Sequence, residues 1–254
     1  MALSSCAIPV PAMATVPNPY WQAWEGQALV VGAGGLGLAL AAELARRAPL
    51  LRVRTAGRRA ADLPLDLSDD GSLERFSAMA AVDLAPLRVV INTAGMLHDG
   101  ALQPEKRLSQ VRRHALERSF AVNAYGPLLL AQAIEPALAR DCPVHFASLS
   151  ARVGSIGDNR LGGWYAYRAA KAAQNQLLRT LAIEWQRRLP QACVTLLHPG
   201  TVSTPLSAPF RGSLAPSGLF TPARSASHLL DVLEGQMAST SGAFLAWDGQ
   251  PVPW

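Results

Sequence analysis

The chain has 254 residues, and half of them are hydrophobic, which is enough to bury a substantial core. Charged residues make up 16% without any long polar tract, so the composition excludes an intrinsically disordered protein. The net charge of +5 comes mainly from scattered arginines, which argues against nucleic-acid binding. No apolar run approaches the roughly 18 residues that span a bilayer, so we expect no membrane partner.

The first 26 residues differ from the rest of the chain. They lack an early Lys or Arg and a long apolar core, so they fit neither a secretory signal nor a transit peptide. They end in the aromatic residues Tyr20, Trp21 and Trp24. We expect a loosely ordered extension over 1–26 until these aromatics pack, and one domain over 27–254.

Three widely separated cysteines, Cys6, Cys142 and Cys193, form neither a disulfide framework nor a metal-binding pair. We therefore expect free thiols, no metal site and a reducing, cytoplasmic location.

After the extension, short apolar runs alternate with longer helical patterns. The predicted strands are Gln27–Val31, Leu51–Thr55, Leu87–Asn92, Val144–Leu149, Cys193–His198 and Ala243–Trp247. The predicted helices start near Leu36, Ser72, Lys106, Trp164 and Thr221. Strands such as VVI and VTLL are uniformly apolar, which is typical of strands buried on both faces. The alternation predicts a single-domain, doubly wound parallel sheet in a three-layer α/β/α fold. The stretch Ser203–Leu219, rich in Pro, Ser and Gly, is expected to be a long loop.

A glycine-rich turn joins the first predicted strand to its helix. Its cofactor candidates are Gly32, Gly34, Gly35, Leu36 and Gly37. Glycines permit the tight turn and a close approach of pyrophosphate, and the helix N-terminus supplies free N–H groups. Between a strand and a helix, this pattern predicts a Rossmann-type dinucleotide site.

The end of the second strand indicates which dinucleotide binds. NAD sites carry an acidic residue there, roughly 20 residues after the turn. Here Arg58 and Arg59 occupy that region, and Arg58 can pair with a 2′-phosphate. NADP, as NADPH, is therefore expected, with NAD as the less favoured cofactor. Asp66 and Leu67 are candidates for contact with the adenine.

Tyr167 and Lys171 are four residues apart in YAYRAAK, so on a helix they share a face. The reference pKa of a tyrosine, about 10, is too high for a base at neutral pH, and a nearby ammonium lowers it. Such a tyrosine can exchange a proton with a carbonyl or alcohol oxygen. Tyr165 is interpreted as an ordinary helix aromatic.

The order of these motifs resembles the short-chain dehydrogenase/reductase family, from about residue 27 to the end. Finer features, such as LHDGALQPEKRL and SIGDNRLGGWYAYRAAKAA, resemble its C-factor-like branch. The resemblance implies that Lys171 and Tyr167 also contact the nicotinamide ribose. It implies that Asn123 supports a helix kink and a proton-relaying water. Further cofactor contacts are implied at Asn92, Ala94, Gly95, Pro199, Gly200, Thr201, Val202 and Thr204.

The family also places a catalytic serine at the end of the central strand. Counting back from Gly154, the usual register falls on Ala151. A one-residue insertion would return Ser150 to the site, or the strand lacks the hydroxyl. We take Ser150 as the candidate and Ser148 as the reserve, since alternate residues of a strand share a face.

Together these features predict an NADP(H)-dependent oxidoreductase that transfers a hydride to or from a carbonyl or alcohol substrate. A homo-oligomer, dimer or tetramer, is expected from the resemblance. The alternative is a catalytically weak binding or signalling protein on the same scaffold, because one fold can carry unrelated functions. A sugar-nucleotide epimerase or dehydratase fits less well, because the C-terminal part is too short for a separate substrate domain.

Overall fold

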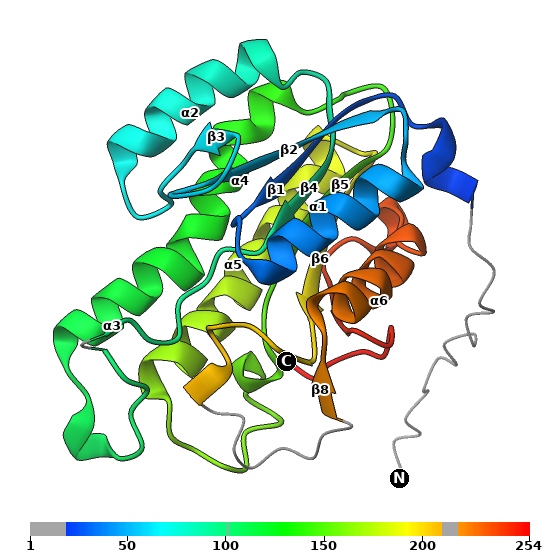
Figure 1. Ribbon diagram of the computed structural model, residues 1–254. Helices are drawn as coiled ribbons and strands as arrows, with labels where there is room; N and C mark the ends of the chain where they lie inside the picture. Colours follow the sequence, from blue (N-terminus) through cyan, green and yellow to red (C-terminus); the bar gives the residue numbers. More distant parts are fainter. Residues whose placement is uncertain (1–18, 101, 210–217) are drawn as a thin grey trace, which may run out of the picture.

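The computed structural model describes residues 19–100, 102–209 and 218–254, and a seven-stranded parallel sheet forms its centre (Figure 1). The strand order is β3-β2-β1-β4-β5-β6-β9, and every neighbouring pair is parallel. The strands are β1 (Gly26–Val31), β2 (Leu51–Gly57), β3 (Leu63–Pro64), β4 (Leu87–Asn92), β5 (Val144–Leu149), β6 (Ala192–His198) and β9 (Ala243–Ala246). A small second sheet pairs β7 (Thr201–Val202) with β8 (Leu219–Phe220).

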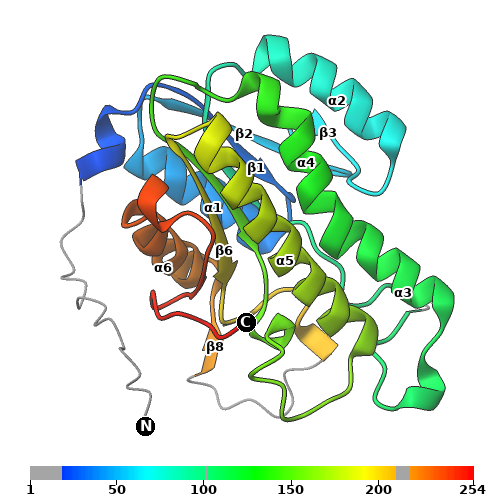
Figure 2. The same cartoon turned by 180° about the vertical axis from the view of Figure 1, so that it is seen from behind.

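Helices cover both faces of the large sheet (Figures 1 and 2). One face carries α1 (Gly35–Arg47) and α6 (Pro222–Glu234), which pack against each other. The other carries α2 (Asp70–Asp83), α3 (Arg113–Phe120), α4 (Gly126–Ile134) and α5 (Tyr165–Arg188). A π-helical turn, Ala121–Tyr125, joins α3 to α4.

Two hydrophobic clusters, one on each face of the sheet, form the core. Phe146 of β5 packs edge-on against Trp185 of α5 in one, and Leu40 of α1 and Leu229 of α6 lie in the other. Every residue of β4 and β5 is buried, as expected for central parallel strands. The predicted doubly wound, three-layer α/β/α fold is therefore confirmed.

The structure corrects the secondary-structure prediction at several points. The helix predicted to start near Lys106 begins at Arg113. Before it, the Glu105 carbonyl accepts a 2.5 Å hydrogen bond from the backbone of Trp164, which holds this segment against the start of α5. Strands β3, β7 and β8, of two residues each, were not predicted because they are too short to show a period. The predicted loop Ser203–Leu219 is described only up to residue 209 and from 218, where β8 begins at Leu219.

The sequence just before β1 packs on the amino edge of the sheet. Trp21 and Trp24 are buried, and both lie against the imidazole of His145 at the start of β5. The guanidinium of Arg88 lies 4.1 Å from the ring centre of Trp24. Most of the expected N-terminal extension, residues 1–18, lies outside the described residues.

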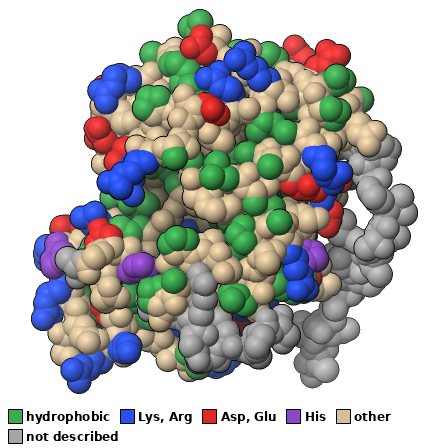
Figure 3. All heavy atoms as spheres, in the orientation of Figure 1, with side chains coloured by type: hydrophobic (Ala, Val, Ile, Leu, Met, Phe, Trp, Pro, Cys, Tyr) green, Lys and Arg blue, Asp and Glu red, His purple; other side chains and the backbone are tan. Residues whose placement is uncertain are grey.

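On the face shown in Figure 3, Lys and Arg side chains are scattered among acidic and apolar ones and do not form one basic patch. Within the described ranges, no helix has the length and apolar character needed to cross a membrane.

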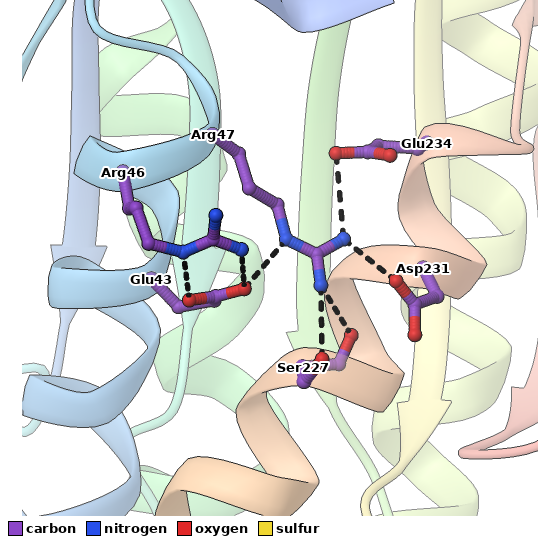
Figure 4. A network of polar contacts seen from close by, with 6 residues as sticks. All are labelled: Glu43, Arg46, Arg47, Ser227, Asp231 and Glu234. Atoms are coloured by element: carbon purple, nitrogen blue, oxygen red, sulfur yellow. Dashed lines mark hydrogen bonds and ion pairs between the residues drawn. The ribbon is translucent and has the colours of Figure 1, made fainter. Parts of the chain in front are cut away.

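An ionic network around Arg47 joins the ends of α1 and α6 (Figure 4). The Arg47 guanidinium donates to Glu43 of α1 and to Asp231, Glu234 and Ser227 of α6, at 2.7–3.4 Å. Hydrogen bonds from Arg46, then Arg47, lower the pKa of Glu43 to about 2. Because α1 follows the glycine-rich turn and α6 follows the loop after β6, this network fixes two helices whose preceding segments lie at the carboxyl edge of the sheet.

We predict that Arg47→Ala lowers the free energy of unfolding by about 2 kcal/mol, the scale of a lost hydrogen bond to a charged group. The loss arises because Glu234, a largely buried carboxylate, is left without its cation. Urea denaturation measures the effect, with Arg46→Ala as the control because Arg46 is exposed. Equal stability of the two variants would contradict this role of Arg47.

Candidate active site

The candidate site lies at the carboxyl edge of the sheet, where four central strands end. Because the strands are parallel, the segments that follow β1, β4, β5 and β6 meet at this edge. These segments are the glycine-rich turn, residues 92–98, residues 150–154 and residues 199–209.

Two glycines of the turn after β1 have no room for a side chain. Gly32 has φ +100°, and an added Cβ would lie 2.5 Å from Thr93 Oγ1. An added Cβ on Gly37 would lie 1.8 Å from the Gly32 carbonyl oxygen. Thr93 Oγ1 donates to the carbonyls of Val31 and Gly32, which ties this turn to the end of β4.

The rest of the turn fits a dinucleotide phosphate. Gly34, which precedes α1, provides no side-chain cap, so the first N–H groups of this helix are not satisfied by it. An added Cβ on Gly34 would meet no atom within 4 Å, so this backbone faces open space. Gly35 and the buried Leu36 begin the helix, and Thr204 lies opposite Gly35. Free N–H groups beside open space are what an anion at a helix N-terminus requires.

The end of β2 presents cations to the same edge. Arg58 and Arg59 are exposed in the bend after β2. Burial acts to raise the pKa of Asp66, but hydrogen bonds from Ser68 and the charges of Arg58 and Arg118 outweigh it, so that pKa is lowered. Leu67 is buried, next to Gly126 at the start of α4.

The turn after β4 lies against the catalytic candidates. Asn92 is fully buried; its Nδ2 donates to Ser148 Oγ, and its Oδ1 accepts from the backbone of Ala94. An added Cβ on Gly95 would lie 3.3 Å from Asn123 Oδ1 and 3.8 Å from Lys171 Nζ. The backbone at Gly95 therefore passes close to both groups.

Asn123 occupies the π-helical turn between α3 and α4. Its Oδ1 accepts from the Met96 N–H at 2.9 Å, and its Nδ2 donates to the Met96 carbonyl at 2.7 Å and to Ser119 Oγ. The side chain thus pairs with the backbone of Met96 much as a neighbouring strand would. Single π turns are frequent at functional sites.

Tyr167 and Lys171 lie one turn apart on α5, with the Lys171 Nζ 5.8 Å from the centre of the Tyr167 ring. Lys171 is 2% exposed, and its ammonium donates to the Leu149 carbonyl and to Gln174 Oε1, both at 2.9 Å. Burial raises the pKa of Tyr167 to about 12, opposite in direction to the lowering expected from the sequence with a nearby ammonium, and burial lowers the pKa of Lys171 to about 7. Among the described residues, nothing forms a hydrogen bond with the Tyr167 hydroxyl. Tyr165 is exposed.

Both candidate serines are buried and hydrogen bonded. Ser150 Oγ donates to Asn175 Oδ1 of α5 at 2.6 Å. Ser148 Oγ accepts from Asn92 and from Gln174 Nε2, so its oxygen is engaged within the core. Ala151, where the usual register falls, precedes the turn Arg152–Gly154.

The segment after β6 closes the site from the side of α6. The Pro199 carbonyl accepts from Ser225 of α6, and Gly200 has φ +74°, where a Cβ would lie 2.7 Å from Phe220. Thr201 and Val202 form β7, which leads to Thr204. The ring of His98 lies 3.2–3.3 Å from the carbonyls of Pro205 and Leu206, so it bridges the segments after β4 and β6.

Sequence reasoning missed Glu105, whose carboxylate is buried beside the start of α5. Its Oε2 accepts from the Ala166 N–H, while Trp164, which precedes the helix, provides no side-chain cap. Glu105 and Tyr167 also line one small cavity of about 20 Å³. Nothing local in the sequence connects Glu105 to a helix 60 residues away.

His198, at the end of β6, received no chemical role from the sequence. Burial, then the charge of Arg152, lowers its pKa to about 4, so the ring is neutral at pH 7. Among the residues that the structure describes, no three His, Cys, Asp or Glu side chains gather as metal ligands do.

Comparisons with known proteins agree with this arrangement. The family model described as enoyl-(acyl carrier protein) reductase matches residues 31–250. C-signal of Myxococcus xanthus is 34% identical over 170 residues, covering 66% of this chain and 93% of that protein. The 1-hydroxy-2-glutathionyl-2-methyl-3-butene dehydrogenase of Rhodococcus sp. (strain AD45) is 29% identical over 192 residues, covering 75% and 78%.

Solved structures show the same fold. An NADPH-bound carbonyl reductase from chicken fatty liver has a TM-score of 0.74 at 25% identity, covering 91% of this chain and 99% of that one. Carbonyl reductase Sniffer of D. melanogaster has a TM-score of 0.76 at 24% identity, covering 91% and 100%. The chain belongs to the short-chain dehydrogenase/reductase family, as its motifs predicted. It is an oxidoreductase of this family.

We predict that Asn123→Ala lowers the free energy of unfolding by about 2 kcal/mol, because the N–H and carbonyl of Met96 lose their partner. Urea denaturation measures the loss, and hydrogen exchange at the Met96 amide should quicken. The control is Asn159→Ala, at an exposed turn. Unchanged exchange at Met96 would count against this role of Asn123.

Proposed function

We propose that this protein is an NADP(H)-dependent carbonyl reductase in which Tyr167 exchanges a proton with the substrate oxygen. The observation that carries the proposal is the placement of Tyr167 and Lys171 on one turn of α5, with the ammonium beside the turn at Gly95. When bound, the nicotinamide supplies or accepts the hydride. The substrate is a small carbonyl compound or alcohol, and the ratio of the cofactor forms sets the direction.

The protonated, neutral form of Tyr167 is the form that reduction of a carbonyl substrate requires. With its pKa raised by burial to about 12, the phenol keeps its proton at neutral pH and can donate it to a carbonyl oxygen. Oxidation needs the phenolate instead. A charged Lys171 favours the phenolate through its positive field, and it therefore serves the reverse direction.

Other residues position the reactants in this proposal. Lys171 also holds the nicotinamide ribose, and Asn123 fixes the backbone that borders Lys171 and holds a proton-relaying water. Ser150 is the proposed third catalytic group. Its hydroxyl would donate its hydrogen bond to the substrate oxygen in place of Asn175 Oδ1. The remaining cofactor contacts are proposed at the glycine-rich turn, Asp66–Leu67, Asn92–Gly95 and Pro199–Thr204. We place the enzyme in the cytoplasm as a homo-oligomer, dimer or tetramer.

Preference for NADP(H) over NAD(H) rests on the end of β2. Arg58 is exposed there, and its charge contributes to lowering the pKa of Asp66, a residue proposed to contact the adenine, which supports the proposal that Arg58 binds the 2′-phosphate. The similar chicken carbonyl reductase was solved with NADPH, which supports the same assignment.

For the mechanism, we predict that Tyr167→Phe lowers kcat by at least about a hundredfold, since general acid catalysis contributes 10²–10⁴. NADPH oxidation is followed with a panel of aldehydes, ketones and quinones. Tyr165→Phe, two residues earlier and exposed, is the matched control and should retain the rate. If wild type and Tyr167→Phe react equally fast with every substrate, the mechanism is wrong.

For the cofactor, we predict that Arg58→Ala raises the Kd of NADPH about tenfold or more and leaves that of NADH unchanged, because one charge-assisted contact is lost. Fluorescence titration measures both constants. Arg52→Ala, an exposed arginine on β2, is the control. Equal affinities for NADPH and NADH in the wild type, or tighter binding of NADH, would contradict the proposed role of Arg58.

A further inference from the structure

Gln174 is a fully buried amide on the face of α5 that covers the sheet. A buried amide costs free energy unless its donors and acceptor are satisfied. A hydrophobic residue would fill this position without that requirement, so the contacts of Gln174 need an explanation.

The amide of Gln174 is held in one orientation. Its Nε2 donates to Ser148 Oγ at 2.8 Å and to the Leu149 carbonyl at 3.3 Å, and its Oε1 accepts from Lys171 Nζ at 2.9 Å. The reversed amide would set its NH₂ group against an ammonium, which can only donate. The oxygen of Gln174 is therefore directed at Lys171.

The contacts of Gln174 continue to the turn after β4. Ser148 Oγ also accepts from Asn92 Nδ2, and Asn92 and Ser148 are paired residues of β4 and β5. Asn92 Oδ1 in turn accepts from the Ala94 N–H. Hydrogen bonds thus run without interruption from Ala94 through Asn92, Ser148 and Gln174 to Lys171, across two strands and one helix.

Lys171 depends on neutral partners to stay in place. Its ammonium has two hydrogen-bond acceptors, the Leu149 carbonyl and Gln174 Oε1, and it forms no ion pair with a described carboxylate. On its own helix, the ring centre of Tyr167 lies 5.8 Å from the ammonium. A lysine side chain has a flexible stem, so its acceptors determine where the charge sits.

We propose that Gln174 is a positioning residue that, anchored through Ser148 and Asn92, fixes the ammonium of Lys171 next to Tyr167. For its effect on catalysis this inference rests on the proposed function, whereas its effect on Lys171 does not. Gln174 stabilises the charged form of Lys171 with its amide dipole and leaves the ammonium one remaining hydrogen to donate. A displaced ammonium would no longer act on Tyr167, because catalysis is sensitive to shifts of about 1 Å.

The test observes Lys171 directly, because the chain has only two lysines, Lys106 and Lys171. Lysine labelled with ¹³C and ¹⁵N gives two side-chain signals by NMR, and the exposed Lys106 serves as the internal reference. In Gln174→Met the Lys171 signal should move and titrate at a lower pH than in the wild type, because a stabilising dipole is lost. In Gln174→Glu it should titrate at a higher pH, because a carboxylate replaces the amide.

Opposite shifts in the two variants separate positioning from general damage to the fold. Gln176→Met, an exposed glutamine on the same helix, is the matched control and should leave both signals unchanged. Ser148→Ala should lower the pH at which Lys171 titrates, as Gln174→Met does, since it removes the hydroxyl that anchors the Gln174 amide. An unmoved Lys171 signal in a folded Gln174 variant, or shifts in one direction for both variants, would overturn the proposal.

Turnover adds a second readout. Gln174→Met should lower kcat for carbonyl reduction about ten- to a hundredfold, the scale of one lost hydrogen bond to a charged group, with a smaller change in KM. The NMR titration needs neither cofactor nor substrate. A wild type without reductase activity would therefore refute the proposed function alone, and an active wild type with an unmoved Lys171 signal in the variants would refute this inference alone.

Discussion

The ammonium of Lys171 is buried at the carboxyl edge of the sheet with neutral oxygens as its partners, and much of the surrounding structure serves to keep it there. Moving a charge out of water is costly, and hydrogen bonds from correctly placed dipoles must offset that cost. The end of β5 supplies the Leu149 carbonyl, and α5 supplies Gln174. The turn at Gly95 passes close by because it has no side chain. The carboxyl edge of the sheet thus holds a buried lysine whose charged form the fold destabilises by burial and stabilises by these hydrogen bonds.

Much of the architecture follows from local sequence. Strands β4 and β5 have the predicted bounds because central parallel strands are buried on both faces and therefore rich in apolar residues, as in VVI of β4. Helices α1, α5 and α6 start within one residue of their predicted starts. The prediction of a helix start near Lys106 was wrong for a long-range reason, since the Glu105 carbonyl accepts a hydrogen bond from the backbone of Trp164, a residue far along the chain.

The candidate site was predictable to the extent that its residues lie in recognisable turns. The glycine-rich turn, Asn92–Gly95 and the Tyr167–Lys171 spacing each mark a strand end or a helix face. Gln174 carries no such mark, because a polar residue on a helix is usually a surface residue, and Glu105 carries none because its partner at Ala166 is far along the chain; only the packing of α5 reveals what these two contact. The serines show the same limit, since strand alternation places Ser148 and Ser150 on one face but does not say which group each hydroxyl meets.

The π-helical turn at Asn123 makes the chain more sensitive to the deletion of a residue than to most substitutions. An exchange of a side chain other than Asn123 there keeps the number of residues in the turn, whereas loss of one residue would convert the turn to regular α-helix. Each residue of an α-helix turns the chain by about 100°, so such a deletion would either rotate Asn123 away from Met96 or rotate the apolar face of α4 off the sheet. Relatives of this protein should therefore vary in composition between α3 and α4 far more readily than in length.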